Sequence, residues 1–332
     1  AAKSYSPSAY TLQWQKAMYW VRENTPQNAV FGHWWDYGYW VQSIGERATV
    51  LDGGNAISYW NHLMGRYALT GRDNIQALEF LYAHNATHFL IDSSDIEKYI
   101  AFSLIGSDEN YDRTSSINIF LREDEVKTNE NNITTYLYSG NPVRIEDDII
   151  YNLNGTKVFL PAGNTIVGGA AIKRDQLGNV VDQPYGVYIY NSKLYSLPLR
   201  YGYYNEKFID FDSGIEAGIF LYDVIKSVDN NLELEKDGAL LYLNNRTVKS
   251  QLARLYLYKE SNPYFTLVHS EDDIFVKRIK ESGVNINDFV QYQGFRGPIK
   301  IWQISYPDGI QFKEEYLRTE YPQELTKAND LS

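Results

Sequence analysis

The sequence predicts an α+β fold, in which a mostly α-helical core domain is interrupted by an antiparallel β-rich insertion. Apolar residues recur at helical spacing over about the first third of the 332 residues, up to Asp112. β-branched and aromatic runs separated by Gly, Asn and Asp follow, which is typical of antiparallel strands. Helical periodicity then returns at Asn245.

Four helices are expected in the first third, over residues 9–21, 57–69, 75–82 and 96–105. Ser8 is a candidate N-cap of the first helix and Asp73 of the third, because their side-chain oxygens can accept a free backbone N–H. Pro26 ends the first helix and Gly106 the last. Before the fourth helix, the apolar run 87–91 has the length of a buried strand.

The β-rich part is expected to contain short strands at 117–121, 134–138, 158–160, 185–190, 219–222 and 239–243. The pairs Asn154-Gly155 and Asp237-Gly238 predict turns between strands, since these residue types tolerate positive φ. The chain is completed by one helix and two closing strands, over 245–258, 265–268 and 299–304.

We therefore predict four parts. The first is a helical core over residues 1–122, and the second is the β-rich insertion over residues 123–243. The chain returns to the core over residues 244–306 and ends in a polar tail over residues 307–332.

Composition excludes several classes of function. With 31 basic and 42 acidic residues the net charge is −11, so a phosphate backbone repels the chain and nucleic-acid binding is not expected. Cysteine is absent, which excludes disulfides, thiol nucleophiles and cysteine-based zinc sites. No apolar stretch approaches the roughly 18 residues of a membrane-spanning helix. Since the chain begins without Met, we expect a fragment of a longer protein.

One segment carries most of the functional information. Within residues 31–40, six aromatic residues surround a single carboxylate, Asp36. This segment can be a turn packed into a core, with Asp36 accepting backbone N–H bonds. Alternatively, a small hydroxyl group, which both donates and accepts hydrogen bonds, is bound by the indole N–H groups of Trp34 and Trp35 and by Asp36.

Two motifs in this chain resemble those of one enzyme family. The pentapeptide Trp34–Gly38 (Trp-Trp-Asp-Tyr-Gly) resembles the signature of the catalytic subunit of oligosaccharyltransferase, the enzyme of Asn-linked protein glycosylation. The spacing of Asp95, Lys98 and Phe102 resembles the family's second motif, Asp-x-x-Lys-x-x-x-Met/Ile, with Phe in the place of Met or Ile.

The resemblance implies an activity and its partners. The family transfers an oligosaccharide from a polyprenyl (dolichol) phosphate or pyrophosphate carrier to Asn of Asn-x-Ser/Thr in an acceptor polypeptide. We expect this chain to be the soluble C-terminal globular domain of that membrane protein, at the extracellular face of the cell membrane. The likeness covers residues 10–106 and, more weakly, 252–305, and the absence of cysteine and the acidity point to an archaeal member.

The resemblance also implies an acceptor site. The hydroxyl of the Ser or Thr two positions after Asn is expected to contact Trp34, Trp35 and Asp36. The same pocket is expected to be lined by Lys98 and by Phe102, the latter against the Thr methyl group. Supporting roles are expected for Tyr37, Gly38 and Asp95, with Asp95 orienting Lys98. From the spacing alone, an ordinary i, i+3 ion pair of Asp95 and Lys98 at a helix start is the alternative.

No cofactor is expected in this chain. When the amide nitrogen of Asn bonds to the first sugar, it displaces the lipid-linked phosphate, an anionic leaving group; this needs a divalent cation, Mn2+ or Mg2+, held by carboxylates. The family holds that cation in its membrane half, so we expect no catalytic residue here and no activity of this chain alone. Asp210 and Asp212 resemble the Asp-x-Asp metal motif of nucleotide-sugar glycosyltransferases, and a β-turn is the alternative.

Two rival functions come from other classes. The 29 tyrosines and seven tryptophans suit an extracellular carbohydrate-binding module, because aromatic faces stack on sugars. The acidity and the β content suit a cell-surface structural protein. Neither rival explains both motifs in order along one chain.

Overall fold

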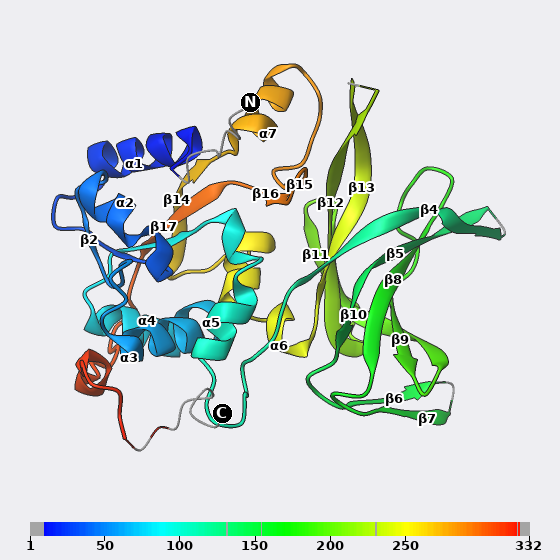
Figure 1. Cartoon of the computed structure of the whole chain (residues 1–332), viewed down its shortest axis with the longest axis horizontal. Helices are drawn as coiled ribbons and strands as arrows, with labels where there is room; N and C mark the ends of the chain where they lie inside the picture. Colours follow the sequence, from blue (N-terminus) through cyan, green and yellow to red (C-terminus); the bar gives the residue numbers. More distant parts are fainter. Residues whose placement is uncertain (1–9, 131, 154, 230, 324, 326–332) are drawn as a thin grey trace, which may run out of the picture.

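The computed structural model of the chain describes residues 10–130, 132–153, 155–229, 231–323 and 325. Most helices gather in one half of the molecule, and long antiparallel strands form the other half (Figure 1). Helix makes up 25% and strand 37% of the structure. The prediction of a mostly α-helical core domain is therefore wrong, because strands outweigh helices and a sheet lies inside the helical half.

The α-helices are α1 (Leu12–Asn24), α2 (Gly38–Ser43), α3 (Ser58–Leu63), α4 (Asn74–Ala83), α5 (Tyr99–Ile105), α6 (Asn245–Val248) and α7 (Ile274–Glu281). Two π-helical segments follow α3 and α6, over Met64–Leu69 and Ala253–Leu257. Three short 3-10 turns cover Trp35–Tyr37, Ser93–Asp95 and Glu314–Leu317.

The strands are β1 (Val30–Gly32), β2 (Ala48–Thr49), β3 (His88–Ile91), β4 (Asn118–Glu130), β5 (Ile133–Arg144), β6 (Ile149–Leu153), β7 (Thr156–Leu160), β8 (Ile166–Arg174), β9 (Tyr185–Tyr190), β10 (Lys193–Tyr204), β11 (Lys207–Asp210), β12 (Ile215–Val228), β13 (Asn231–Leu243), β14 (Phe265–Glu271), β15 (Val290–Gln291), β16 (Phe295–Arg296) and β17 (Ile299–Ile304).

The helical half is built on a five-stranded sheet with the order β14-β17-β3-β1-β2. β1 runs parallel to both β2 and β3, whereas β17 is antiparallel to β3 and β14. All four residues of β3 are buried, so its sequence has no alternation to mark it as a sheet strand. This sheet matters for function because the loops after β1 and β3 leave it at the same edge.

The other half contains a closed sheet of seven strands, β10-β9-β8-β5-β4-β13-β12, in which β10 and β12 pair to complete the ring. Its interior has a hydrophobic core of its own. In that core the hydroxyl groups of Tyr188 and Tyr242 lie 2.8 Å apart, so each buried phenol has a partner. A second core joins the halves, and there Tyr203 of β10 stacks on Phe220 of β12.

Several predicted boundaries change for identifiable physical reasons. α1 begins after Thr11, whose hydroxyl accepts from Trp14 N, and the expected cap Ser8 lies outside the described residues. Asp73 caps α4 as predicted. Asp237-Gly238 does not form a turn, because β13 runs through it and the positive φ of Asp237 accompanies a register shift against β12.

The β half is larger than predicted because pairing continues beyond the apolar runs. β4 extends through polar residues to Glu130 while it remains paired to β5. β8 was missed since its centre is Gly-Gly-Ala-Ala, which has low strand propensity, and β10 contains Pro198. The part boundaries 1–122, 123–243, 244–306 and 307–332 stay a proposal.

Candidate functional site

The first motif forms a tight turn at the end of β1. The chain leaves the sheet at Gly32, makes the 3-10 turn Trp35–Tyr37 and continues directly into α2. Trp34 and Tyr37 are each only 2% exposed, whereas the turn leaves Trp35 and Asp36 half-buried at the surface. One side of the turn is thus part of the core and the other is accessible; whether it binds a hydroxyl group stays a prediction.

The second motif follows β3, the parallel neighbour of β1. Because the carboxyl ends of adjacent parallel strands lie at one edge of a sheet, the loops after Gly32 and Ile91 are brought together. Asp92 shapes the second loop as a capping box: its Oδ1 accepts from Ser94 N at 2.8 Å, and its own N–H donates to Asp95 Oδ2 at 3.0 Å. This turn carries Lys98 to the first motif.

The two motifs meet through three side-chain contacts. Lys98 Nζ lies 2.6 Å from Asp36 Oδ2. It also donates to the Tyr37 hydroxyl at 3.1 Å, across 61 positions of sequence. The Tyr37 hydroxyl in turn donates to Asp95 Oδ1 at 2.6 Å. Asp95 therefore reaches Lys98 through Tyr37, and Lys98 forms its ion pair with Asp36.

Aromatic packing supports this cluster from below. Tyr37 stacks on Trp14 of α1, with ring centroids 4.8 Å apart. Phe102 on α5 is fully buried. Its ring packs edge-on against Trp34, with the ring centroids 5.5 Å apart and the ring planes at 61°. Trp34 and Phe102 thus form a buried wall, while the accessible polar surface comes from Asp36 and Lys98, whose side chains are 24% and 31% exposed.

One hydrogen-bond donor in this cluster has no partner. The indole Nε1 of Trp35 is shielded from solvent and makes no hydrogen bond within the part of the chain that the structure describes. A buried N–H without a partner costs about 1–3 kcal/mol. An incoming hydroxyl group could remove that cost by accepting from Trp35 while it donates to Asp36.

Burial sets the protonation states behind the site. It raises the pKa of Asp95 to about 7, and the negative charge of Asp92 adds to the rise. Burial also raises the pKa of Tyr37 well above its usual value, so its hydroxyl keeps the proton that it donates to Asp95. On the same loop, burial lowers the pKa of His33 to about 4.

Gly38 is required by a close approach of two loops. A Cβ atom at this position would lie 2.4 Å from Asp52 Cα and 2.6 Å from Leu51 O, which are backbone atoms that cannot rotate away. The glycine therefore lets the motif turn pack directly against the loop at residues 51–52.

The Asp-x-Asp sequence has a structural role at the end of β11, the strand that pairs with β10 of the closed sheet. Asp210 accepts two hydrogen bonds from Arg200, at 2.8 Å from Nε and 3.1 Å from Nη2. Asp212 donates its backbone N–H to Asp210 Oδ1 at a positive φ of 59°, as in a turn. Among the described residues, no group of three or more His, Cys, Asp or Glu side chains is placed to hold a metal ion.

Sequence reasoning named most of this cluster and missed some of its parts. Asp92 was not predicted to have a role. Its position directly after the apolar run 87–91 is nevertheless typical of an N-cap, and it caps the turn Ser93–Asp95 that follows the strand. Trp14 lies within the first predicted helix, and nothing in the sequence connected it to the site. Tyr37 was expected to support the site, and the structure places it at the centre, in contact with Lys98 and Asp95.

Comparison with known proteins assigns the first part of the chain. Residues 27–149 match the STT3/PglB/AglB core domain. Over these residues the chain is similar to the core domain of that family. The resemblance to the catalytic subunit of oligosaccharyltransferase is thereby confirmed over this segment, which contains both motifs.

Individual relatives agree with this assignment. Dolichyl-phosphooligosaccharide-protein glycotransferase 1 of Pyrococcus furiosus is 36% identical over 98 residues, which are 29% of this chain and 10% of that protein. The STT3B subunit of the Oryza sativa dolichyl-diphosphooligosaccharide–protein glycosyltransferase is 30% identical over 105 residues, which cover 28% of this chain and 14% of that subunit. The chain thus matches about a tenth of the length of such relatives.

A solved structure, the C-terminal domain of C. jejuni PglB, aligns with 88% of this chain and all of that domain, at 9% identity and a TM-score of 0.42. Within the described residues of the present chain, no helix has the length and apolar character needed to cross a bilayer.

The raised pKa of Asp95 predicts a pH-dependent stability. Its value of about 7 in the folded chain exceeds the unfolded value of about 3.9, so between these pH values the folded chain holds a proton that the unfolded chain has lost. The stabilising contribution is present near pH 4 and is lost as the pH rises through 7. In Asp95→Asn this pH-dependent loss of stability should disappear. The free energy of unfolding is measured by denaturant unfolding from pH 4 to 8.

The readout is the difference between wild type and variant at each pH, because His33 titrates with the opposite sign in the same range. Asp73→Asn is the control: it replaces an exposed carboxylate at an N-cap and shows how much the free energy of unfolding changes when any Asp becomes Asn. A difference between wild type and Asp95→Asn that stays constant from pH 4 to 8 would show that Asp95 is ionised throughout.

Proposed function

We propose that this chain is the acceptor-recognition part of a glycotransferase that transfers a lipid-linked oligosaccharide to Asn of Asn-x-Ser/Thr. In this proposal the cluster around Asp36 binds the hydroxyl of the Ser or Thr two positions after Asn. The observation that carries it is the 2.6 Å contact of Asp36 with Lys98, which joins the two motifs. Trp35, the residue before Asp36, has an indole N–H without a partner among the described residues.

The chemistry of a hydroxyl fits the groups that are available. A Ser or Thr hydroxyl that leaves water needs both a donor and an acceptor in return. Trp35 supplies a donor and Asp36 an acceptor, while Lys98 holds the carboxylate in place. An acceptor with Ala or Val at this position would leave those polar groups unpaired, and such sites reject the analogue strongly.

Not every residue of the predicted site has the same access. We propose that Trp35, Asp36 and Lys98 touch the acceptor, since their side chains reach the surface. Trp34 and Phe102 are buried and would shape the pocket from behind, the latter toward a Thr methyl group. Tyr37 and Asp95 would position Lys98 through their hydrogen bonds.

The remaining functions belong to the proposed whole protein. The Pyrococcus furiosus relative is named a dolichyl-phosphooligosaccharide-protein glycotransferase, and we propose the same class of activity for the protein that contains this chain. We further propose that it is a membrane protein with this domain on the extracellular side, and that a divalent cation bound outside this chain activates the phosphate.

Replacing Asp36 tests the acceptor site directly. In the complete enzyme, Asp36→Ala should reduce kcat/KM for an Asn-x-Thr peptide by about 100-fold or more, because the hydroxyl loses its charged acceptor. Transfer is measured with a labelled peptide, and thermal unfolding checks the fold. Asp73→Ala, which removes a carboxylate from an exposed helix cap, is the matched control. Full activity of Asp36→Ala would contradict the proposal that Asp36 binds the Ser or Thr hydroxyl.

Phe102 is expected to affect the choice between Thr and Ser. Phe102→Ile and Phe102→Met should keep activity, since the family has Ile or Met at this place. Phe102→Ala should lower stability by about 3–5 kcal/mol and also reduce the ratio of Thr to Ser acceptor use, because the wall behind Trp34 is lost. A purely structural residue would change stability and leave that ratio unchanged, so the ratio is the decisive measurement.

A further inference from the structure

A pocket lies where the two halves of the molecule meet, distant in sequence from both motifs. It has a volume of about 310 Å³, at the lower end of small-ligand sites, which span about 300–1,000 Å³. The lining comes from β10, β11, the loop before α4, the end of α6 and the segment that follows α6 (Figure 1). It consists of Arg72, Tyr201, Phe208, Asp210, Val248, Lys249, Arg254, Tyr258 and Glu260.

Three aromatic rings form one continuous surface in this pocket. Tyr201 and Phe208 stack at a centroid distance of 5.6 Å and an angle of 18°, and Phe208 contacts Tyr258 at 4.6 Å. Phe208 is 42% exposed, so part of its ring faces solvent. An exposed aromatic face of this kind suits the C–H face of a sugar ring.

The pocket is also basic, on a chain that is acidic overall. Three cations and two carboxylates line it, and Asp210 is already held by Arg200. Lys249 Nζ lies over the Tyr201 ring at 5.2 Å, which fixes one positive charge next to the aromatic surface. Within the lining, cations exceed carboxylates by one, although Lys249 also pairs with Glu216 and Arg254 lies 3.7 Å from Glu260. This small excess of positive charge favours an anionic ligand.

Two buried polar atoms of the lining lack partners. The Tyr258 hydroxyl, on a side chain that is 7% exposed, and Arg254 Nε make no hydrogen bond among the residues that the structure describes. Each leaves a donor whose burial costs free energy unless a ligand pairs with it. The other nitrogens of Arg254 are engaged, Nη2 with Asn74 and Gln251 and Nη1 at 3.7 Å from Glu260. The Nε–H of Arg254 and the phenol of Tyr258 are single donors, and such donors can bind a carboxylate.

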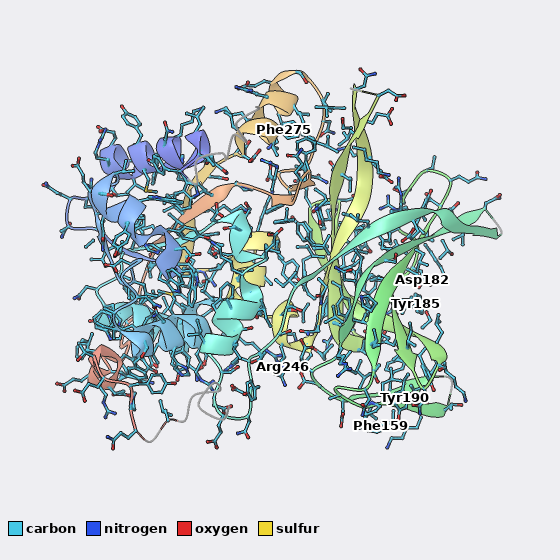
Figure 2. All side chains as sticks on the ribbon, in the orientation of Figure 1. Phe159, Asp182, Tyr185, Tyr190, Arg246 and Phe275 are labelled. Carbon is cyan, nitrogen blue, oxygen red and sulfur yellow. The ribbon has the colours of Figure 1, made fainter. Side chains whose placement is uncertain are left out.

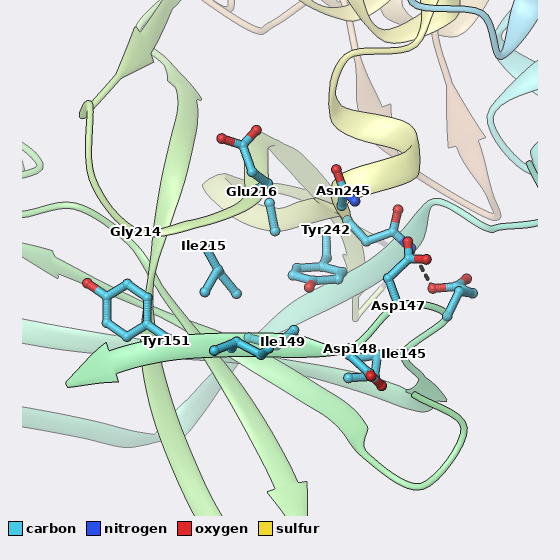
Figure 3. Close-up of a pocket in the computed structure, with 14 residues that line it drawn as sticks. Ile145, Asp147, Asp148, Ile149, Tyr151, Gly214, Ile215, Glu216, Tyr242 and Asn245 are labelled. Atoms are coloured by element: carbon cyan, nitrogen blue, oxygen red, sulfur yellow. Dashed lines mark hydrogen bonds between the residues drawn. The ribbon is translucent and has the colours of Figure 1, made fainter. Parts of the chain in front are cut away.

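The neighbouring pocket has the opposite character (Figure 3). Its acidic side chains already have protein partners: Glu146 accepts from Asn244 at 2.7 Å, Asp147 pairs with Arg246 at 2.7 Å, and Glu216 pairs with Lys249 at 3.0 Å. The Glu216–Lys249 pair links the two pockets. The unmet hydrogen-bonding capacity is thus in the basic pocket and not in the acidic one.

We propose that the pocket around Phe208 binds a carboxylate-bearing sugar, a uronic acid residue of an oligosaccharide. The sugar ring lies against Phe208, and its carboxylate pairs with Arg254 Nε and the Tyr258 hydroxyl. This inference goes beyond the proposed acceptor site and stands independently of it, because no residue is shared.

The test is to titrate the chain with methyl glucuronide, methyl glucoside or acetate and to measure each affinity by NMR. Methyl glucuronide should bind about tenfold more tightly than methyl glucoside, the neutral sugar, or acetate, the bare anion. Phe208→Ala and Tyr258→Phe should each weaken glucuronide binding by about two- to tenfold. Phe159→Ala, which removes a ring of similar exposure (50%, against 42% for Phe208) from β7, should leave glucuronide binding unchanged.

The outcomes separate the possible sources of binding. Equal affinity for glucuronide and glucoside would overturn the role of the carboxylate, and equal affinity for acetate would overturn the role of the ring. No binding of glucuronide would overturn the proposal as a whole. Loss of glucuronide binding in Phe159→Ala but not in Phe208→Ala would place the site elsewhere.

Discussion

The contact between Lys98 and Asp36 depends on the parallel pairing of β1 and β3. Each strand ends at the same edge of the five-stranded sheet, and each is followed at once by a turn that carries one motif. The first turn is held against its neighbouring loop by Gly38, and the second by the capping box of Asp92. The ion pair of Lys98 and Asp36, with 2.6 Å between Nζ and Oδ2, is thereby formed by two short turns that follow neighbouring strands. No long flexible loop is needed.

The site combines a rigid interior with a polar surface. Tyr37, Asp95 and Trp34 are buried, and their hydrogen bonds and ring contacts leave them little freedom. Lys98 and Asp36 stand on this base and remain accessible. Placing the binding groups on a packed support keeps them in geometry before a ligand arrives, which reduces the ordering cost of binding.

Sequence reasoning was most successful where chemistry is local. The helix cap Asp73 could be predicted from residue type and spacing, because a cap acts within three residues. The two motifs were found through their resemblance to a known family. The balance of helix and strand could not, because β4 and β5 stay strands through polar residues only by pairing with each other. The hydrogen bonds that connect Asp95 to Lys98 through Tyr37 could not be predicted either, since they depend on which strands are neighbours in the sheet.

A double-mutant cycle on Asp36 and Lys98 tests the central claim most directly. Transfer to an Asn-x-Thr peptide is measured in the complete enzyme for Asp36→Asn, Lys98→Met and the double variant. If the two side chains act as one hydroxyl-binding unit, the double variant loses little more than either single one, with a coupling energy of about 1 kcal/mol or more. Additive losses would contradict a shared site and would show that the 2.6 Å contact of Asp36 with Lys98 is not coupled to transfer.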